Sequence, residues 1–180
     1  AVIGGLARAL ELTGYQYIIP AFKRLLADDP NAVLLLANTD GPYKPQLDAM
    51  LADIRQNHVV EIFYARPNLL YACMDAYVHA PIRADLEAFG QTYVEALIAR
   101  VPSVFTLAGV APEFIAHERD ARVVPFCDSQ AIEAGLRWIL THPQEAQAMA
   151  VRGYETVSAR YRIRPWVQAM HGLWRELAGR

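Results

Sequence analysis

Two glutamates, Glu87 and Glu95, have the spacing in this sequence that most clearly suits chemistry. Between them, Gly90, Gln91 and Thr92 precede a run whose apolar residues recur at helical spacing. The first N–H groups of a helix have no partner within it and lie at the positive end of its dipole. Such a helix start suits a phosphate, and Gly90, which has no side chain, allows a ligand close to the backbone.

The two carboxylates are staggered along this junction. Glu87 lies just before the helix start, whereas Glu95 lies about a turn and a half inside the helix, at about 1.5 Å of rise per residue. Carboxylates accept hydrogen bonds from hydroxyl groups. The pair therefore suits the two ends of an elongated ligand whose middle is anionic.

These residues also have ordinary interpretations. A lone glutamate on a helix is more often a solvated surface residue, and Asp85 competes with Glu87 for the position before the helix. Seven residues separate Glu87 from Glu95, and Phe89-Gly90 follow soon after Glu87. Both features favour Glu87 over Asp85. His79, at the end of the preceding apolar run, is more often a satisfied core histidine than a catalyst.

Strands and helices alternate along the chain and must position these side chains. Apolar runs predict strands at residues 1–6, 33–37, 59–63, 75–80, 103–106 and 122–124. Helical patterns occupy residues 15–27, the region around 47–54, residues 69–73, the segment after Gly90, residues 112–115, residues 128–140, and most of 143–180. This alternation predicts an α/β fold, with a doubly wound parallel sheet of about six strands that binds ligands at its carboxyl edge.

Local signals refine the last third of the chain. Asp128 is expected to cap the helix that follows it, with Glu133 and Arg137 spaced for a surface ion pair. Pro165 reads as a first-turn residue of the last helix, after an interruption near residues 162–164. The aromatic and arginine cluster at residues 160–166 suits contact with anionic lipid. We favour a solvated helix junction there, with Trp166 packed inward.

Residues 87–96 read E-A-F-G-Q-T-Y-V-E-A, and Val101-Pro102 follow them. This pattern resembles the E-G-F-G-x-T-x-x-E-A element and the G-V-P turn of retaining GT-B glycosyltransferases of the GT4 family, also called glycosyl transferases group 1. The resemblance covers nearly the whole chain. It implies that residues 1–180 are one Rossmann-like, donor-binding domain ending in helices at 143–180, the C-terminal half of a GT-B fold. The N-terminal acceptor domain would be absent from this chain.

The resemblance also implies a role for each matching residue. Glu95 would hold the ribose hydroxyls, and Glu87, the catalytic candidate, the sugar hydroxyls. The backbone of residues 90–92 and the side chain of Arg8 would bind the diphosphate. The implied donor-binding set is Arg8, Thr13, Phe89, Gly90, Gln91, Thr92 and Glu95.

Three departures from the family pattern stand out. Thr13 occupies the lysine position of an R-x4-K pair, where it can hydrogen-bond a phosphate oxygen but brings no charge. Arg100 replaces the usual glycine of the G-V-P turn, and the loop at residues 81–87 is longer. Of the three, only Thr13 changes a side chain that the chemistry is thought to need.

The implied activity is retaining transfer of a hexose from a donor such as a UDP- or GDP-sugar. The acceptor would be a glycan or lipid-linked molecule in bacterial polysaccharide or glycolipid biosynthesis. No cofactor or metal is expected, and the fragment alone should be inactive. Two alternatives stay open: another GT-B nucleotide-sugar enzyme, such as an epimerase or phosphorylase, and a non-catalytic nucleotide-binding or scaffolding domain.

Two glutamates also serve in glycoside hydrolases, so hydrolysis has to be weighed. Those enzymes place their carboxyl groups about 5–5.5 Å apart for retention and up to about 9.5 Å for inversion, around one glycosidic bond. Glu87 and Glu95 instead straddle a helix start that suits a phosphate. We therefore favour transfer.

Bulk properties set further limits. The 180 residues suit one domain, and a net charge of −2 gives no electrostatic case for nucleic acid. The 54% apolar residues are broken by charge, so neither a membrane span nor a signal peptide is expected. Cys73 and Cys127 lie in runs that look buried, and no Cys/His cluster has metal-ligand spacing. The simplest location is the cytoplasm, and the alternative in which residues 160–166 contact anionic lipid would place the protein at the inner face of the membrane.

Overall fold

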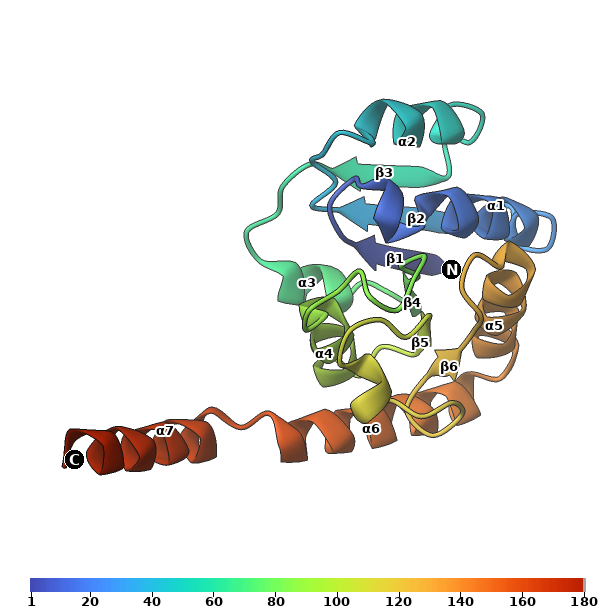
Figure 1. Ribbon diagram of the computed structural model, residues 1–180. Coiled ribbons are helices and arrows are strands. Elements are labelled where there is room, and N and C mark those ends of the chain that lie inside the picture. Colours follow the sequence, from blue (N-terminus) through green and yellow to red (C-terminus); the bar gives the residue numbers. More distant parts are fainter. Residues whose placement is uncertain (180) are drawn as a thin grey trace.

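A six-stranded sheet, with every strand pair parallel, forms the centre of the computed structural model, which describes residues 1–179 (Figure 1). The strands are β1 (Val2–Leu6), β2 (Val33–Ala37), β3 (His58–Glu61), β4 (Ala76–His79), β5 (Ser103–Phe105) and β6 (Arg122–Val123). Their order across the sheet is β3-β2-β1-β4-β5-β6. The predicted Rossmann-like α/β fold with about six strands is confirmed.

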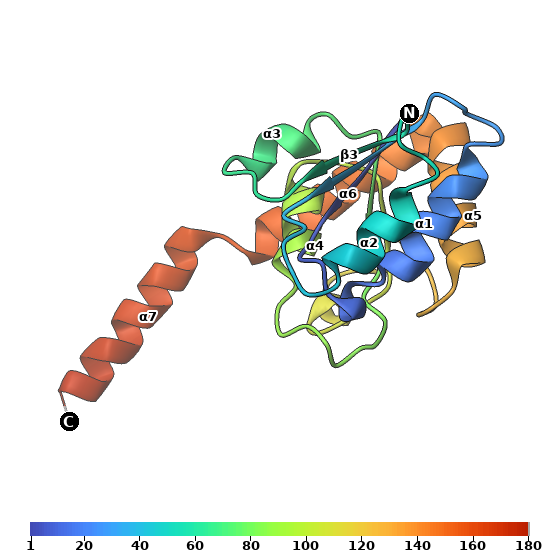
Figure 2. The same ribbon diagram turned by 90° about the horizontal axis from the view of Figure 1, so that it is seen from above.

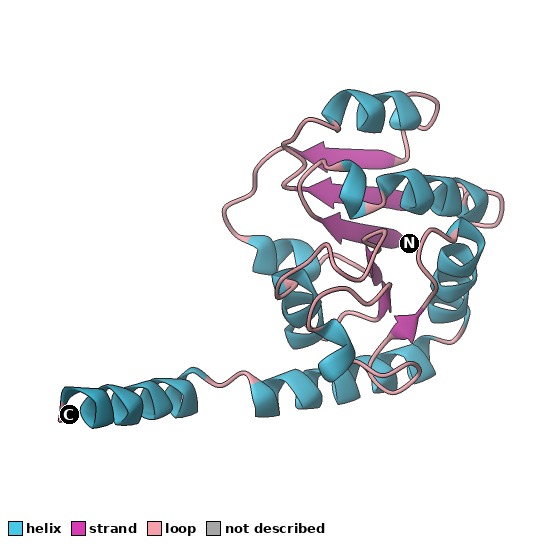
Figure 3. Cartoon of the chain, viewed as in Figure 1, coloured by secondary structure: helices cyan, strands magenta, loops and turns pink. Residues whose placement is uncertain are grey.

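Helices cover both faces of the sheet (Figure 3). They are α1 (Tyr15–Leu25), α2 (Lys44–Leu51), α3 (Pro67–Tyr71), α4 (Gln91–Ile98), α5 (Ser129–Thr141), α6 (Pro143–Arg160) and α7 (Ile163–Ala178), with short 3-10 turns η1 (Glu11–Thr13) and η2 (Ala111–Glu113). One apolar cluster joins the sheet to α1, α2 and α5, and the other joins it to α3 and α4. Because both faces are buried, the central strands are continuously apolar rather than alternating.

Strand β4 shows how one segment supplies both clusters. Ala76 and Val78 pack in the cluster with α1 and α5, while Tyr77 between them packs in the cluster with α3 and α4. Tyr77 meets the ring of Phe105 edge to face, with centroids 6.1 Å apart. The end of β4 is therefore held rigidly from both sides.

The strand order creates a crevice between β1 and β4. From β1 the chain continues to β2 on one side, and from β4 it continues to β5 on the other. The chain therefore leaves β1 and β4 toward opposite sides of the sheet, and ligands of doubly wound sheets bind at this point of the carboxyl edge. The loop after β1 contains Arg8 and Thr13, and the loop after β4 contains Glu87.

Several local predictions are confirmed. The Asp128 carboxylate accepts from the N–H groups of Gln130 and Ala131, both at 2.9 Å, and so caps α5. Glu133 and Arg137 form the expected ion pair at 2.9 Å. Pro165 lies in the first turn of α7.

Both cysteines were predicted to be buried, and that prediction is wrong. Cys73 and Cys127 are exposed. Cys73 lies in the turn just after the end of α3, and Cys127 lies in a turn with a φ of 58° before α5. Both cysteines lie in turns rather than in a helix or strand. The apolar residues next to them in the sequence therefore gave no indication that the thiols are exposed.

Several predicted elements have different bounds, among them the third strand and the helix after it. The third strand ends at Glu61 instead of residue 63, and Ile62 and Phe63 are 60% and 76% exposed, because β3 is an edge strand and the chain leaves the sheet there. The short helix predicted at residues 69–73 begins earlier, with Pro67 in its first turn.

The prediction that Trp166 packs inward is also wrong. Trp166 is 60% exposed, and α7 buries no residue. The helix projects away from the sheet and its covering helices (Figures 1 and 2). Tyr161, just before the break, is the last packed residue of this region and meets Phe89 and Phe114 edge to face. No helix within residues 1–179 is long and apolar enough to cross a bilayer.

Candidate functional site

A cavity of about 400 Å³ lies at the carboxyl ends of β1, β2 and β4. We call it the strand-end cavity. Its walls come from the loop after β1, the residue after β2, the start of α3, the end of β4 and one side of α4: Leu6, Ala7, Arg8, Leu10, Thr13, Asn38, Pro67, His79, Glu87, Gln91, Thr92 and Glu95. Six of the eight predicted site residues line this cavity, in the crevice that the strand order creates, and Phe89 and Gly90 do not.

The loops after β1 and β4 each lead into a helix through a glycine. Gly14 caps α1 at a φ of 83°, and a Cβ on it would lie 1.9 Å from the Ala80 carbonyl oxygen. Gly90 caps α4 at a φ of 72°, where a Cβ would lie 2.4 Å from the Tyr93 ring. Only glycine fits these left-handed, crowded positions. The loops after β1 and β4 therefore touch. Gln91 and Thr92 at the start of α4 line the cavity, so the unpaired N–H groups of that helix start lie at its wall, and Thr13, just before Gly14, lines it as well.

Glu95 is held by a residue that the sequence did not single out. The Tyr71 hydroxyl donates to Glu95 Oε2 at 3.1 Å. Burial, followed by the neighbouring Tyr77 and Glu95, raises the pKa of Tyr71, so its hydroxyl keeps its proton and remains a donor. Within residues 1–179, Glu95 Oε1 makes no hydrogen bond to protein and can accept one from a ligand.

Glu87 has a partner of its own at the end of β4. His79 Nε2 lies 2.7 Å from Glu87 Oε1. The Glu87 side chain is 24% exposed and the His79 side chain only 4%. A buried imidazole thus lies behind a cavity-lining carboxylate, a contact that goes beyond the expected core histidine.

Arg8 and Thr13 share one loop but differ in what they offer a ligand. Arg8 is exposed, and its guanidinium makes no ion pair within the described residues. Thr13 Oγ1 donates to the Arg8 carbonyl oxygen at 2.8 Å. Its proton is therefore used within the loop, so Thr13 shapes the wall rather than offering a free donor to a phosphate.

Phe89 and Asp85 lie away from this cavity. The Phe89 ring packs edge to face against Tyr161, with centroids 5.3 Å apart. Asp85 is exposed and pairs with Arg83 at 2.9 Å, whereas Glu87 lines the cavity. Of these two candidates for the position before the helix, only Glu87 lines the cavity.

A model of one protein family, described as glycosyl transferases group 1, matches residues 1–156. The chain belongs to this family. A search of curated proteins gave no match. The family assignment thus rests on most of the chain, including both glutamates and both glycine-capped helix starts.

Solved structures similar to this group 1 glycosyltransferase chain share its fold. HepE from Anabaena, solved in complex with UDP and glucose, is 20% identical with a TM-score of 0.86, over 97% of this chain and 48% of its own. The C-terminal domain of LpcC from Francisella tularensis is 24% identical with a TM-score of 0.78, over 90% of this chain and 86% of its own. Sucrose-phosphate synthase from Thermosynechococcus elongatus is 20% identical with a TM-score of 0.84, over 99% of this chain and 45% of its own. The chain therefore spans about half the length of HepE and of the synthase.

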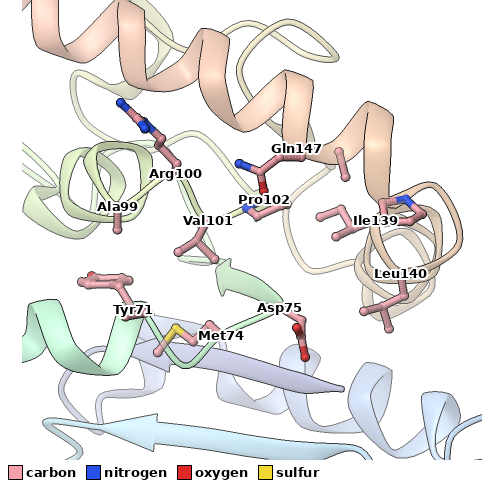
Figure 4. Close-up of a pocket in the computed structure, with 13 residues that line it drawn as sticks. Tyr71, Met74, Asp75, Ala99, Arg100, Val101, Pro102, Ile139, Leu140 and Gln147 are labelled. Atoms are coloured by element: carbon pink, nitrogen blue, oxygen red, sulfur yellow. The ribbon is translucent and has the colours of Figure 1, made fainter.

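The group 1 glycosyltransferase chain has a second cavity of about 370 Å³ (Figure 4). It lies at the amino ends of β4 and β5, because Asp75 and Pro102 in its wall precede those strands. Figure 4 shows Arg100 and Gln147 across from Asp75. Asp75 Oδ2 accepts from the Val2 N–H at 2.7 Å and so fastens a strand start. This cavity lies at the other end of the strands from the glutamates, and we place the site in the strand-end cavity.

Proposed function

We propose that residues 1–180 form the nucleotide-sugar-binding half of a retaining glycosyltransferase of the GT4 type. The observation that supports this most directly is the arrangement of the strand-end cavity, where two separately oriented carboxylates, Glu87 and Glu95, flank the start of α4. Carboxylates suit the hydroxyls of two sugars, and helix starts suit the phosphates between them. The volume of about 400 Å³ falls within the usual range for small-molecule sites.

In this proposal each wall binds one part of the donor. Glu95 Oε1 accepts from the ribose hydroxyls, and Glu87 accepts from the hydroxyls of the transferred hexose. The N–H groups at the starts of α1 and α4, together with Arg8, hold the diphosphate and stabilise the charge that develops as it leaves. Binding then needs no divalent metal. The acceptor would be a glycan or a lipid-linked molecule, in bacterial polysaccharide or glycolipid synthesis.

The first prediction concerns binding without metal. The purified chain should bind one of UDP, GDP or ADP, or the corresponding sugar nucleotides, with micromolar to millimolar affinity in EDTA, because helix N–H groups and one arginine supply the contacts. Isothermal titration calorimetry across this panel, with and without Mg²⁺ or Mn²⁺, measures it. Binding that appears only with a divalent ion would contradict the metal-free site, and no binding at all would contradict the proposed function.

The second prediction concerns turnover. Residues 1–180 should give no sugar transfer above a boiled control, because they supply only the donor site in this proposal. Release of nucleoside diphosphate and labelled transfer to a panel of glycan and lipid acceptors are the measurements. Sustained transfer by this fragment would show that the half-enzyme assignment is wrong.

One observation favours a second candidate, a nucleotide-binding domain without transferase activity. Thr13 occupies the lysine position of the family pattern, and its hydroxyl donates to the Arg8 carbonyl oxygen. Among the residues that line the strand-end cavity, Arg8 is then the one positively charged side chain. Such a domain would bind nucleoside diphosphate and sugar nucleotide equally. A preference for the intact sugar nucleotide that depends on Glu87 separates the two candidates.

A further inference from the structure

His79 lies deeper than any other charged or titratable side chain in the wall of the strand-end cavity. It is the last residue of β4, at the crevice between β1 and β4, and its side chain is only 4% exposed. Burying a polar ring costs free energy unless the ring is hydrogen-bonded. If packing alone were needed here, a leucine would fill similar space without that cost. The hydrogen bond that His79 makes is directed to Glu87.

The orientation of the imidazole is fixed by its surroundings. The ring meets Tyr93 edge to face, with centroids 4.8 Å apart and planes at 77°. The Tyr93 hydroxyl donates to the Thr106 carbonyl oxygen at 2.6 Å and accepts from the Ala108 N–H at 3.2 Å. Burial raises the pKa of Tyr93, so its hydroxyl stays protonated and keeps the bond to Thr106. These contacts fix the imidazole ring of His79 against α4 and against the residues that follow β5.

The contact with Glu87 also determines which oxygen faces a ligand. A carboxylate without a proton only accepts hydrogen bonds, and a His79 tautomer with its proton on Nε2 supplies the donor that the 2.7 Å contact with such a carboxylate requires. That bond occupies Oε1. Glu87 Oε2 has no hydrogen bond to protein within residues 1–179, and it lies 3.0 Å from where a Cβ of Gly90 would be. The free oxygen is thus held beside the start of α4.

We infer that His79 is a positioning residue: its Nε2–H fixes the Glu87 carboxylate so that Oε2 faces the sugar of the donor. This inference rests on the proposed function, because it assigns His79 to the sugar end of that site. Glu87 is in a long loop, where a free carboxylate would sample several rotamers. Holding it in advance reduces the ordering cost of binding.

Calorimetry on matched variants tests the inference, with UDP-glucose and UDP or the corresponding pair that binds best in the panel. His79→Leu should weaken the sugar nucleotide about tenfold and change the free nucleotide by less than about twofold. Glu87→Ala should show the same selective loss, and the double variant should lose little more than either one. His79→Gln retains an N–H donor and should recover most of the affinity. His58→Leu, away from the cavity, is the control.

An NMR measurement on the unmodified chain does not depend on whether a variant folds. Long-range ¹H–¹⁵N spectra should show that the His79 ring carries a proton on Nε2. The His79 signals are identified as the set that disappears in the spectrum of His79→Gln. A neutral ring protonated on Nδ1 instead would overturn the inference, because Nε2 could not donate. The inference would also be overturned if His79→Leu weakened the sugar nucleotide and the free nucleotide equally, or left both affinities unchanged. Additive losses of sugar-nucleotide affinity in the double variant would overturn it as well. Wild-type protein that binds no nucleotide contradicts the proposed function, whereas normal wild-type binding with these variant results contradicts only the role of His79.

Discussion

Replacing Glu95 with alanine should weaken both the free nucleoside diphosphate and the sugar nucleotide by about 1.5–3 kcal/mol, or about 10- to 150-fold. The physical reason is that Oε1 of Glu95, the oxygen left available by Tyr71, is proposed to accept from the ribose, which both ligands contain. Hydrogen bonds to a charged acceptor are stronger than neutral ones. Calorimetric titration of each ligand measures the change.

The control is Glu155→Ala on α6, because Glu155 is an exposed helical glutamate outside the cavity wall. It should change neither affinity. Glu87→Ala gives the complementary comparison, since it should leave the free nucleotide nearly unchanged and weaken only the sugar nucleotide. The staggered arrangement is contradicted if Glu87→Ala and Glu95→Ala reduce binding of the free nucleotide equally, and loss in neither variant would return both residues to ordinary surface glutamates.

Gly14→Ala should lower the free energy of unfolding by about 2–5 kcal/mol. The left-handed backbone at a φ of 83° costs an alanine about 1–2 kcal/mol. Its Cβ would also lie 1.9 Å from the Ala80 carbonyl oxygen, and moving the two loops apart should cost about another 1–3 kcal/mol. Urea unfolding followed by circular dichroism measures the loss.

Gly172→Ala is the matched control for that experiment. Gly172 lies in α7 with no atom within 4 Å of the position a Cβ would take, and alanine is favoured over glycine inside a helix. It should leave the unfolding midpoint unchanged or raise it slightly. Equal midpoints for Gly14→Ala and the wild-type chain would show that the loops after β1 and β4 are not held together as the structure has them.

Strand and helix alternation made the fold predictable, because a parallel sheet buried on both faces leaves continuous apolar runs such as Val33–Ala37. The junction around Gly90 was equally readable, since a glycine before a helical pattern and two fixed glutamates are local features of the sequence. The fold then brings Arg8 to the same cavity from a distant loop. The resemblance to the family, rather than any spacing, had placed Arg8 at that site.

Contacts that depend on how a loop folds back, or on how separate elements pack together, could not be predicted from the sequence pattern. Nothing near Tyr71 indicates that its hydroxyl meets Glu95, which is 24 residues away. The proton of Thr13 was expected to be available to a phosphate, but loop geometry directs it to Arg8. His79 carried a usable signal, a polar residue at the carboxyl end of a buried strand, yet its partner depends on how the loop to Glu87 folds back.

The last helix depends on its own sequence for stability. Isolated helices shorter than about 12–15 residues are marginal in water, and α7, with 16 residues and no buried side chain, is close to that limit. Its backbone amides should exchange hydrogen with solvent far faster than those of β1, in an equilibrium between helix and coil. Trp166, Leu173 and Trp174 are about half exposed or more along it. A surface that covers these side chains would have to order the helix as well as contact it, so its binding should be accompanied by a gain in helix content.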